Sequence, residues 1–114
     1  MELGDVGKYD QLVLVVIQDN DAVDYTTVLS ESGFAHTRIL SAGGFLRSTN
    51  ALFVIGIASD RLADLRTLTS TICTTRNELV TVPWVGELDL SMPVEVEVGG
   101  ASMFVLPLDR AERL

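Results

Sequence analysis

The sequence predicts an α+β fold in which two helices pack on one face of a small β-sheet. Three observations support this prediction. The chain has 114 residues, which suits one domain, and 47% of them are hydrophobic, which is enough for a core. The predicted elements follow the order β-α-β-β-α-β with a further strand at the end. Two right-handed βαβ halves in this order form a ferredoxin-like sandwich. We expect a flexible leader over residues 1–9 and a single domain over residues 10–114.

The first predicted strand and helix have clear boundary residues. Gln11–Gln18 is a mostly apolar, β-branched run, which is typical of a strand buried on both faces. Residues 19–21 (Asp-Asn-Asp) are N-cap candidates for a helix, and Gly33 stands where a C′ glycine would end it. Between them the core positions recur at helical spacing: Ala22, Tyr25 or Thr26, and Leu29.

The middle of the chain repeats this pattern. Ala35–Ala42 alternates, which predicts a second strand with odd- and even-numbered side chains on opposite faces. Ala51–Ala58 is the third predicted strand, Ser59 is the predicted cap of a second helix, and a fourth strand is expected near Glu78. The buried face of the second helix is predicted from four residues: Leu62, Leu65, Thr69 and Ile72.

The end of the chain carries the strongest turn signal. An irregular loop is expected up to Pro93, and Gly99-Gly100 then separates the alternating run Val94–Val98 from the apolar run Ala101–Leu108. Two strands joined by two glycines predict a β-hairpin with a primed turn. The helices cover only one sheet face, and the valines of Val94–Val98 alternate with glutamates, so we expect the uncovered apolar surface to meet a partner subunit.

Charge and hydropathy exclude several classes of partner. Sixteen acidic and eight basic residues give a net charge of −8 without any Lys/Arg cluster, so we expect no binding to nucleic-acid polymers or anionic membranes. The apolar stretch Leu12–Ile17 is too short to span a bilayer, and the acidic N-terminus does not resemble a signal peptide. The single Cys73 allows no internal disulfide. We therefore expect a cytoplasmic protein.

No catalytic or metal-binding pattern is found, so we expect a protein that is not an enzyme and has neither a metal nor a cofactor. His36 is the only histidine and is best explained as a strand side chain. Cys73 lies near the end of the second helix, where the helix dipole raises a thiol pKa, and is expected to be a half-buried packing residue. Glu95 and Glu97 share one strand face, and a solvated face is the simpler interpretation of this pair.

The segment Gly43–Asn50 (GGFLRSTN) is the best candidate for a ligand site. Adjacent glycines let backbone N–H groups converge on an anion, and Arg47 offers a planar donor fork to phosphate. Asn50 can donate to and accept from an adenine edge. Phe45 and Leu46 are large apolar loop residues, whose side chains normally pack over another apolar surface or a ligand. The alternative is a β-connection in which these two side chains pack on the core of their own subunit.

Two blocks of the sequence resemble the PII-like cyclic-di-AMP receptor family: GFAHTRILSAGGFLRSTNALFVIGI at 33–57 and PVEVEVGGASMFVLPLD at 93–109. The resemblance covers most of the chain, from the first strand to Asp109. It implies a homotrimer of ferredoxin-like subunits with one dinucleotide in each cleft between subunits. It also implies a receptor without catalysis, whose loops change conformation on binding and thereby signal to a downstream protein that the sequence does not identify.

Carried over position by position, the resemblance assigns the pocket to seven residues: Thr37, Gly44, Phe45, Leu46, Asn50, Gly56 and Phe104. Together with Arg47 from the loop, these are the predicted ligand-binding residues. Thr37 is expected to supply a hydroxyl, Gly56 room for a close approach, and Phe104 a face for stacking or packing.

The chain departs from the family at two places that concern the ligand. Ala35 stands where the family has an arginine, and the segment Thr81–Met92 is short and carries Trp84 in place of an Asn- and Gly-rich stretch. Arg38 and Arg113 are the candidates to replace the missing cation. Two alternatives remain open: a PII-like module that binds ATP, ADP or a metabolite, and a protein-interaction module without a small ligand.

Overall fold

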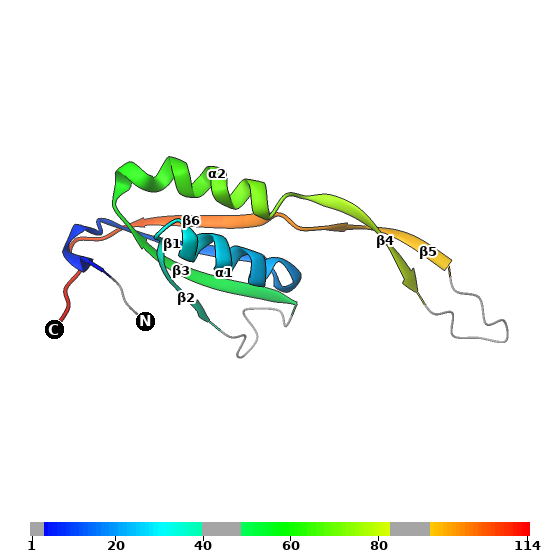
Figure 1. Cartoon of the computed structure of the whole chain (residues 1–114), viewed down its shortest axis with the longest axis horizontal. Helices are drawn as coiled ribbons and strands as arrows, with labels where there is room; N and C mark the ends of the chain where they lie inside the picture. Colours follow the sequence, from blue (N-terminus) through cyan, green and yellow to red (C-terminus); the bar gives the residue numbers. More distant parts are fainter. Residues whose placement is uncertain (1–3, 40–48, 83–91) are drawn as a thin grey trace.

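The computed structural model describes residues 4–39, 49–82 and 92–114, and its main feature is a four-stranded antiparallel sheet. In sheet order the strands are β2 (Ala35–Ile39), β3 (Asn50–Ile57), β1 (Gln11–Gln18) and β6 (Ala101–Pro107). The helices α1 (Ala22–Glu31) and α2 (Leu62–Ile72) lie on one face of this sheet (Figure 1). This arrangement confirms the predicted ferredoxin-like α+β sandwich.

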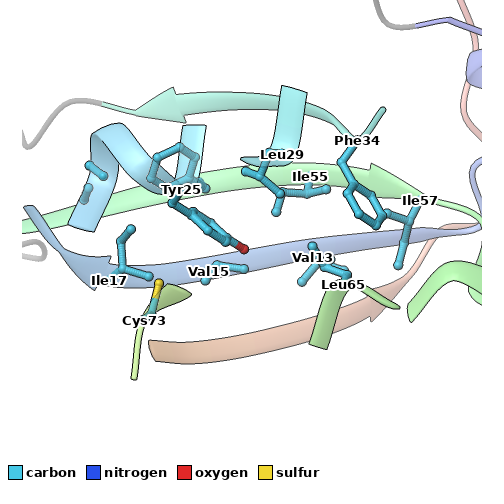
Figure 2. Packing of buried hydrophobic residues seen from close by; sticks show 13 residues of the cluster. Val13, Val15, Ile17, Tyr25, Leu29, Phe34, Ile55, Ile57, Leu65 and Cys73 are labelled. Carbon is cyan, nitrogen blue, oxygen red and sulfur yellow. The ribbon is translucent and has the colours of Figure 1, made fainter. Parts of the chain in front are cut away.

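The core lies between the sheet and the two helices. Alternate residues of β1 and β3 are buried there, and they pack in one cluster with the buried residues of the helices, Tyr25 and Leu65 among them (Figure 2). The ring of Tyr25 packs edge-on against Phe53, with centroids 5.0 Å apart. The other side chains of β1 are only partly buried. The prediction that β1 is buried on both faces is therefore wrong for the single chain, because helices cover only one of them.

The helices begin close to their predicted positions, but the expected cap residues form hydrogen bonds to residues outside the helices instead of capping them. Short 3-10 helices at 19–21 and 59–61 precede α1 and α2, and no side-chain capping hydrogen bond forms at either helix. Instead, the buried carboxylate of Asp21 accepts a 3.0 Å hydrogen bond from Arg76. Ser59 donates through its N–H and its hydroxyl to the carboxylate of Asp10. The end of α1 is as predicted, since Gly33 adopts a φ of +75°.

The strands β4 (Arg76–Val82) and β5 (Met92–Val98) form a separate two-stranded antiparallel ribbon, which extends away from the sheet and helices (Figure 1). The predicted strand near Glu78 is confirmed as β4. The predicted hairpin across Gly99-Gly100 is wrong, because β5 pairs with β4 whereas β6 pairs with β1.

The two glycines join the ribbon to the sheet instead of reversing the chain between paired strands. Both have a φ of +84°. The N–H of Gly100 donates to the carbonyl of Cys73 at 2.6 Å, which holds the junction against the end of α2. A Cβ on Gly99 would lie only 2.2 Å from the carbonyl oxygen of Thr74. Glycine is therefore required here by close passage of the backbone as well as by positive φ.

Candidate functional site

The face of the sheet that the helices leave uncovered, called the open face below, carries the described site residues. The strand register aligns Thr37, Val54, Leu14 and Phe104 in one row across all four strands. Adjacent strands are about 4.8 Å apart, so this row is about 14 Å long. The odd-numbered residues of β1 point to the core, which places the row on the opposite, open face.

Large apolar side chains dominate the open face. They are Leu12, Leu14, Val16, Ile39, Leu52, Val54, Phe104 and Leu106. Phe104 is 56% exposed, and Ile39 and Leu106 are 44% and 42% exposed. A contiguous exposed apolar patch of this kind marks an interaction surface.

Four predicted ligand-binding residues fall within the described ranges, and all four lie on the open face: Thr37, Asn50, Gly56 and Phe104. Thr37 and Phe104 belong to the two edge strands. Asn50 and Gly56 lie near opposite ends of β3, about 20 Å apart. One chain alone therefore does not gather these residues around a single cavity. Gly44, Phe45, Leu46 and Arg47 lie outside the described residues.

The space next to Gly56 is filled by a tyrosine of the same chain. A Cβ on Gly56 would come within 2.8 Å of the ring of Tyr9, so the absence of a side chain allows this close packing. Tyr9 follows the short 3-10 helix Val6–Lys8, which lies in the predicted leader. The flexibility of residues 1–9 and the contact of Gly56 with a ligand both stay predictions.

A recess of about 290 Å³ lies at the end of the sheet beside Asn50. Its polar lining comes from Asn50, from Gln18 and from the segment 99–102. Gln18 is directly opposite Asn50 in the register, and its Oε1 accepts a hydrogen bond from the N–H of Gly99 at 2.7 Å. Sequence reasoning missed Gln18. Its place as the polar last residue of an apolar strand was the only signal that could have drawn attention to it.

The candidate cation Arg38 is engaged away from the open face. It alternates with Thr37 along β2 and pairs in register with the buried Phe53, so it lies on the side that the helices cover. Its guanidinium forms an ion pair with Asp19. Arg38 therefore does not replace the missing arginine at Ala35 on the open face, and Arg113 is exposed near the C-terminus.

A second recess, of about 710 Å³, lies between α2 and β6, and Cys73 is part of its lining. The thiol is free and buried. Burial, and then the negative charge of Asp21, raises its pKa to about 11. The predicted packing role is thus supported, with the thiol more deeply buried than expected. No group of three His, Cys, Asp or Glu residues that could hold a metal occurs within 4–39, 49–82 and 92–114.

Comparison with known proteins decides the family. A family model described as a cyclic-di-AMP receptor matches residues 10–114. The chain belongs to the cyclic-di-AMP receptor family. The resemblance inferred from the two sequence blocks is therefore confirmed, and membership of this receptor family supports nucleotide binding and signal transduction as the class of function.

The cyclic-di-AMP receptor fold of this chain is also seen in a solved structure. The crystal structure of a functionally unknown protein from Pediococcus pentosaceus ATCC 25745 is similar, with a TM-score of 0.74 and 32% sequence identity. The similarity covers 94% of this chain and 99% of that chain. Across the described parts of the receptor, no helix has the length and apolar character needed to cross a membrane.

Proposed function

We propose that this protein is a receptor that binds cyclic di-AMP in the clefts between the subunits of a homotrimer. The observation that carries the proposal is the location of Thr37, Asn50, Gly56 and Phe104 on a single uncovered apolar face. One chain spreads these residues over the face, so a pocket needs a second copy against it. The family description, a receptor, supports binding without chemical conversion of the ligand.

The surface of the single chain supports assembly. Its accessible area is 7968 Å², whereas a compact monomer of this mass exposes about 6,100 Å². Its radius of gyration is 17.7 Å, against about 13 Å for a compact chain of this length. A two-stranded ribbon such as β4–β5 is also only marginally stable by itself in water. Contact between copies would cover both the open face and part of the ribbon.

The chemistry of the residues fits an adenine dinucleotide. The Asn50 amide can pair with an adenine edge, Thr37 can donate its hydroxyl, and Phe104 offers an apolar ring to a base. The segment Gly44–Arg47 would supply backbone N–H groups and a guanidinium to the phosphates.

Signalling would follow from a population shift. If the ligand binds one arrangement of Gly43–Asn50 and Thr81–Met92 better than another, it favours that arrangement and exposes or hides a surface for a downstream protein. The ends of the second segment are parts of β4 and β5, so such a change would reach the ribbon. The proposal includes a cytoplasmic location, where a signalling nucleotide would be available.

A second candidate is an adenine nucleotide other than cyclic di-AMP. The row that contains Ala35 and Gly56 continues through Leu12 and Leu106 and carries no charge. The missing arginine removes one charge-assisted hydrogen bond from a dinucleotide with two phosphates, and such a bond contributes about 1.5–3 kcal/mol.

Calorimetric titration tests the proposal directly. We expect cyclic di-AMP to bind at about one molecule per subunit, and Asn50→Ala to weaken binding at least about tenfold, because the lost amide bonds to the base are not replaced. Asn77→Ala is the matched control, since Asn77 is an exposed residue of the ribbon. Cyclic di-GMP and ATP are titrated in parallel. Binding of ATP but not of cyclic di-AMP would show that ATP is the ligand in place of cyclic di-AMP. No binding of any of the three nucleotides would favour a protein-interaction module.

A further inference from the structure

Gln18 is positioned to take part in the nucleotide site. It is the last residue of β1 and lies directly across from Asn50, the first residue of β3. Both side chains belong to the open face and line the recess at the end of the sheet. Directly paired residues of antiparallel strands have Cβ atoms about 5 Å apart, so the two amides can reach the same planar group.

The orientation of the Gln18 amide is fixed by the backbone of Gly99. The N–H of Gly99 donates to Gln18 Oε1 at 2.7 Å, across 81 residues of sequence. A backbone N–H can only donate, so the oxygen must face Gly99, and both hydrogens of Nε2 are left for another acceptor. Within the described residues, no hydrogen bond from Gln18 Nε2 to a protein acceptor is found.

Gly99 is itself a rigid partner. A side chain on it would collide with the carbonyl of Thr74, and its neighbour Gly100 is bonded to the carbonyl of Cys73. The backbone that holds the Gln18 oxygen is therefore packed against the end of α2. It is also the point where β5 of the ribbon passes into β6 of the sheet.

We propose that Gln18 is a second amide of the nucleotide site, which donates through Nε2 to a ring nitrogen of the adenine that Asn50 contacts. This inference rests on the proposed function and adds one residue to it. An adenine presents several acceptor nitrogens beside one amino group, so one amide can pair with an edge and a second can donate to a remaining nitrogen. Because Gly99 holds the other end of the amide, Gln18 also connects the ligand to the root of the ribbon.

The substitution Gln18→Glu tests the donor role of this amide separately from its acceptor role. The carboxylate keeps an oxygen to accept from Gly99 and loses the donor, so we expect normal folding and at least about a tenfold loss of cyclic di-AMP affinity. Asn77→Asp adds the same charge on the exposed ribbon and is expected to bind within about twofold of the unsubstituted protein.

The new charge of Gln18→Glu would also repel the phosphates, and two measurements remove this ambiguity. In 1 M salt the screening length is about 3 Å, so a loss that persists relative to the unsubstituted protein reports the missing donor. Gln18→Met removes the donor, and with it the oxygen that accepts from Gly99, without adding charge. We expect at least as large a loss, with no dependence on salt beyond that of the unsubstituted protein.

The outcomes distinguish the two proposals. If the unsubstituted protein does not bind cyclic di-AMP, the proposed function is overturned and this inference falls with it. If it binds and Gln18→Met binds equally well, or if the loss in Gln18→Glu vanishes in 1 M salt, the role of Gln18 alone is overturned.

Discussion

The hydroxyl of Tyr25 is the main polar group inside the core. It lies 2.8 Å from Thr69 Oγ1, and this buried hydrogen bond joins α1 to α2. Burial raises the pKa of Tyr25 to about 12, and the hydrogen bond to Thr69 only partly offsets this increase. The residue was predicted only as one of two possible core positions. Its hydroxyl is accommodated because Thr69, at a predicted apolar position of α2, carries a hydroxyl as well.

The substitution Tyr25→Phe is expected to destabilise the protein by about 1–2 kcal/mol, because it leaves the Thr69 hydroxyl buried without its partner. Adding Thr69→Val should recover part of this loss. The free energy of unfolding, measured in urea, checks both variants. A Tyr25→Phe variant as stable as the unsubstituted protein would show that the hydrogen bond contributes nothing net.

Stability is expected to fall in alkaline solution. Folding raises the pKa of Cys73 from 9.0 to about 11 and that of Tyr25 from 10.0 to about 12. Both groups are therefore ionised first in the unfolded chain. Their contribution is complete below about pH 9 and is lost as the pH rises through about 11 and 12.

The measurement is the free energy of unfolding between pH 7 and pH 11, which covers most of this range. The combined variant Cys73→Ala and Tyr25→Phe should show a clearly flatter decrease above about pH 9 than the unsubstituted protein. Equal slopes in the two proteins would assign the alkaline loss to other groups.

At the scale of elements, the decisive feature is how the ribbon joins the sheet. Arg76, the first residue of β4, donates to the buried carboxylate of Asp21 and to Glu78, and these bonds raise the pKa of its guanidinium above its ordinary value. It also donates to the carbonyl of Thr74. The chain passes the end of α2 again at Gly99 and Gly100, between β5 and β6. The root of the ribbon is thus tied to the start of α1 and to the end of α2.

Alanine at Gly99 is expected to be more damaging than alanine at Gly100. Both substitutions place a Cβ at positive φ, at a cost of about 1–2 kcal/mol. At Gly99 the Cβ also meets the Thr74 carbonyl at 2.2 Å, which is backbone. At Gly100 it meets the Thr75 hydroxyl at 2.9 Å, and this side chain can rotate. Melting temperatures of the two variants provide the comparison, and equal values would contradict the close passage at Gly99.

At the scale of the whole molecule, the main feature is the open face, on which the proposed function depends. The net charge of −8 leads us to expect no binding to nucleic acids or anionic membranes, while the apolar rows of the open face favour association with protein. The predicted ligand-binding residues that the structure describes lie on the same face. Assembly and ligand binding are therefore expected to depend on the same surface.

If the protein forms the proposed trimer, the substitution Leu106→Asp is expected to shift it to monomers, because the substitution buries a carboxylate in an apolar contact. Leu106 lies on the open face and is 42% exposed, so the single chain should tolerate the change. Val23→Asp is the control, since Val23 is 73% exposed on α1. Sedimentation equilibrium measures the mass of each. A Leu106→Asp protein that stays trimeric would place the subunit contact elsewhere.

The sequence by itself determined the order of the elements, the residues of the core and the family. Periodicity suffices for these, since buried positions alternate in strands and recur at helical spacing in helices. Alternation also placed Thr37 and Arg38 on opposite faces of one strand, and the family motifs supplied the predicted site residues, which stay predictions. Only the tertiary structure decided which strands pair. Two adjacent glycines permit a hairpin and a close backbone crossing equally well, and contacts with distant residues decide which of the two forms. Here β5 pairs with β4 and β6 pairs with β1, while Cys73 and Thr74 pack against the junction between β5 and β6. The bonds of Asp21 to Arg76 and of Gln18 to Gly99 join residues far apart in the chain, so no local pattern encodes them.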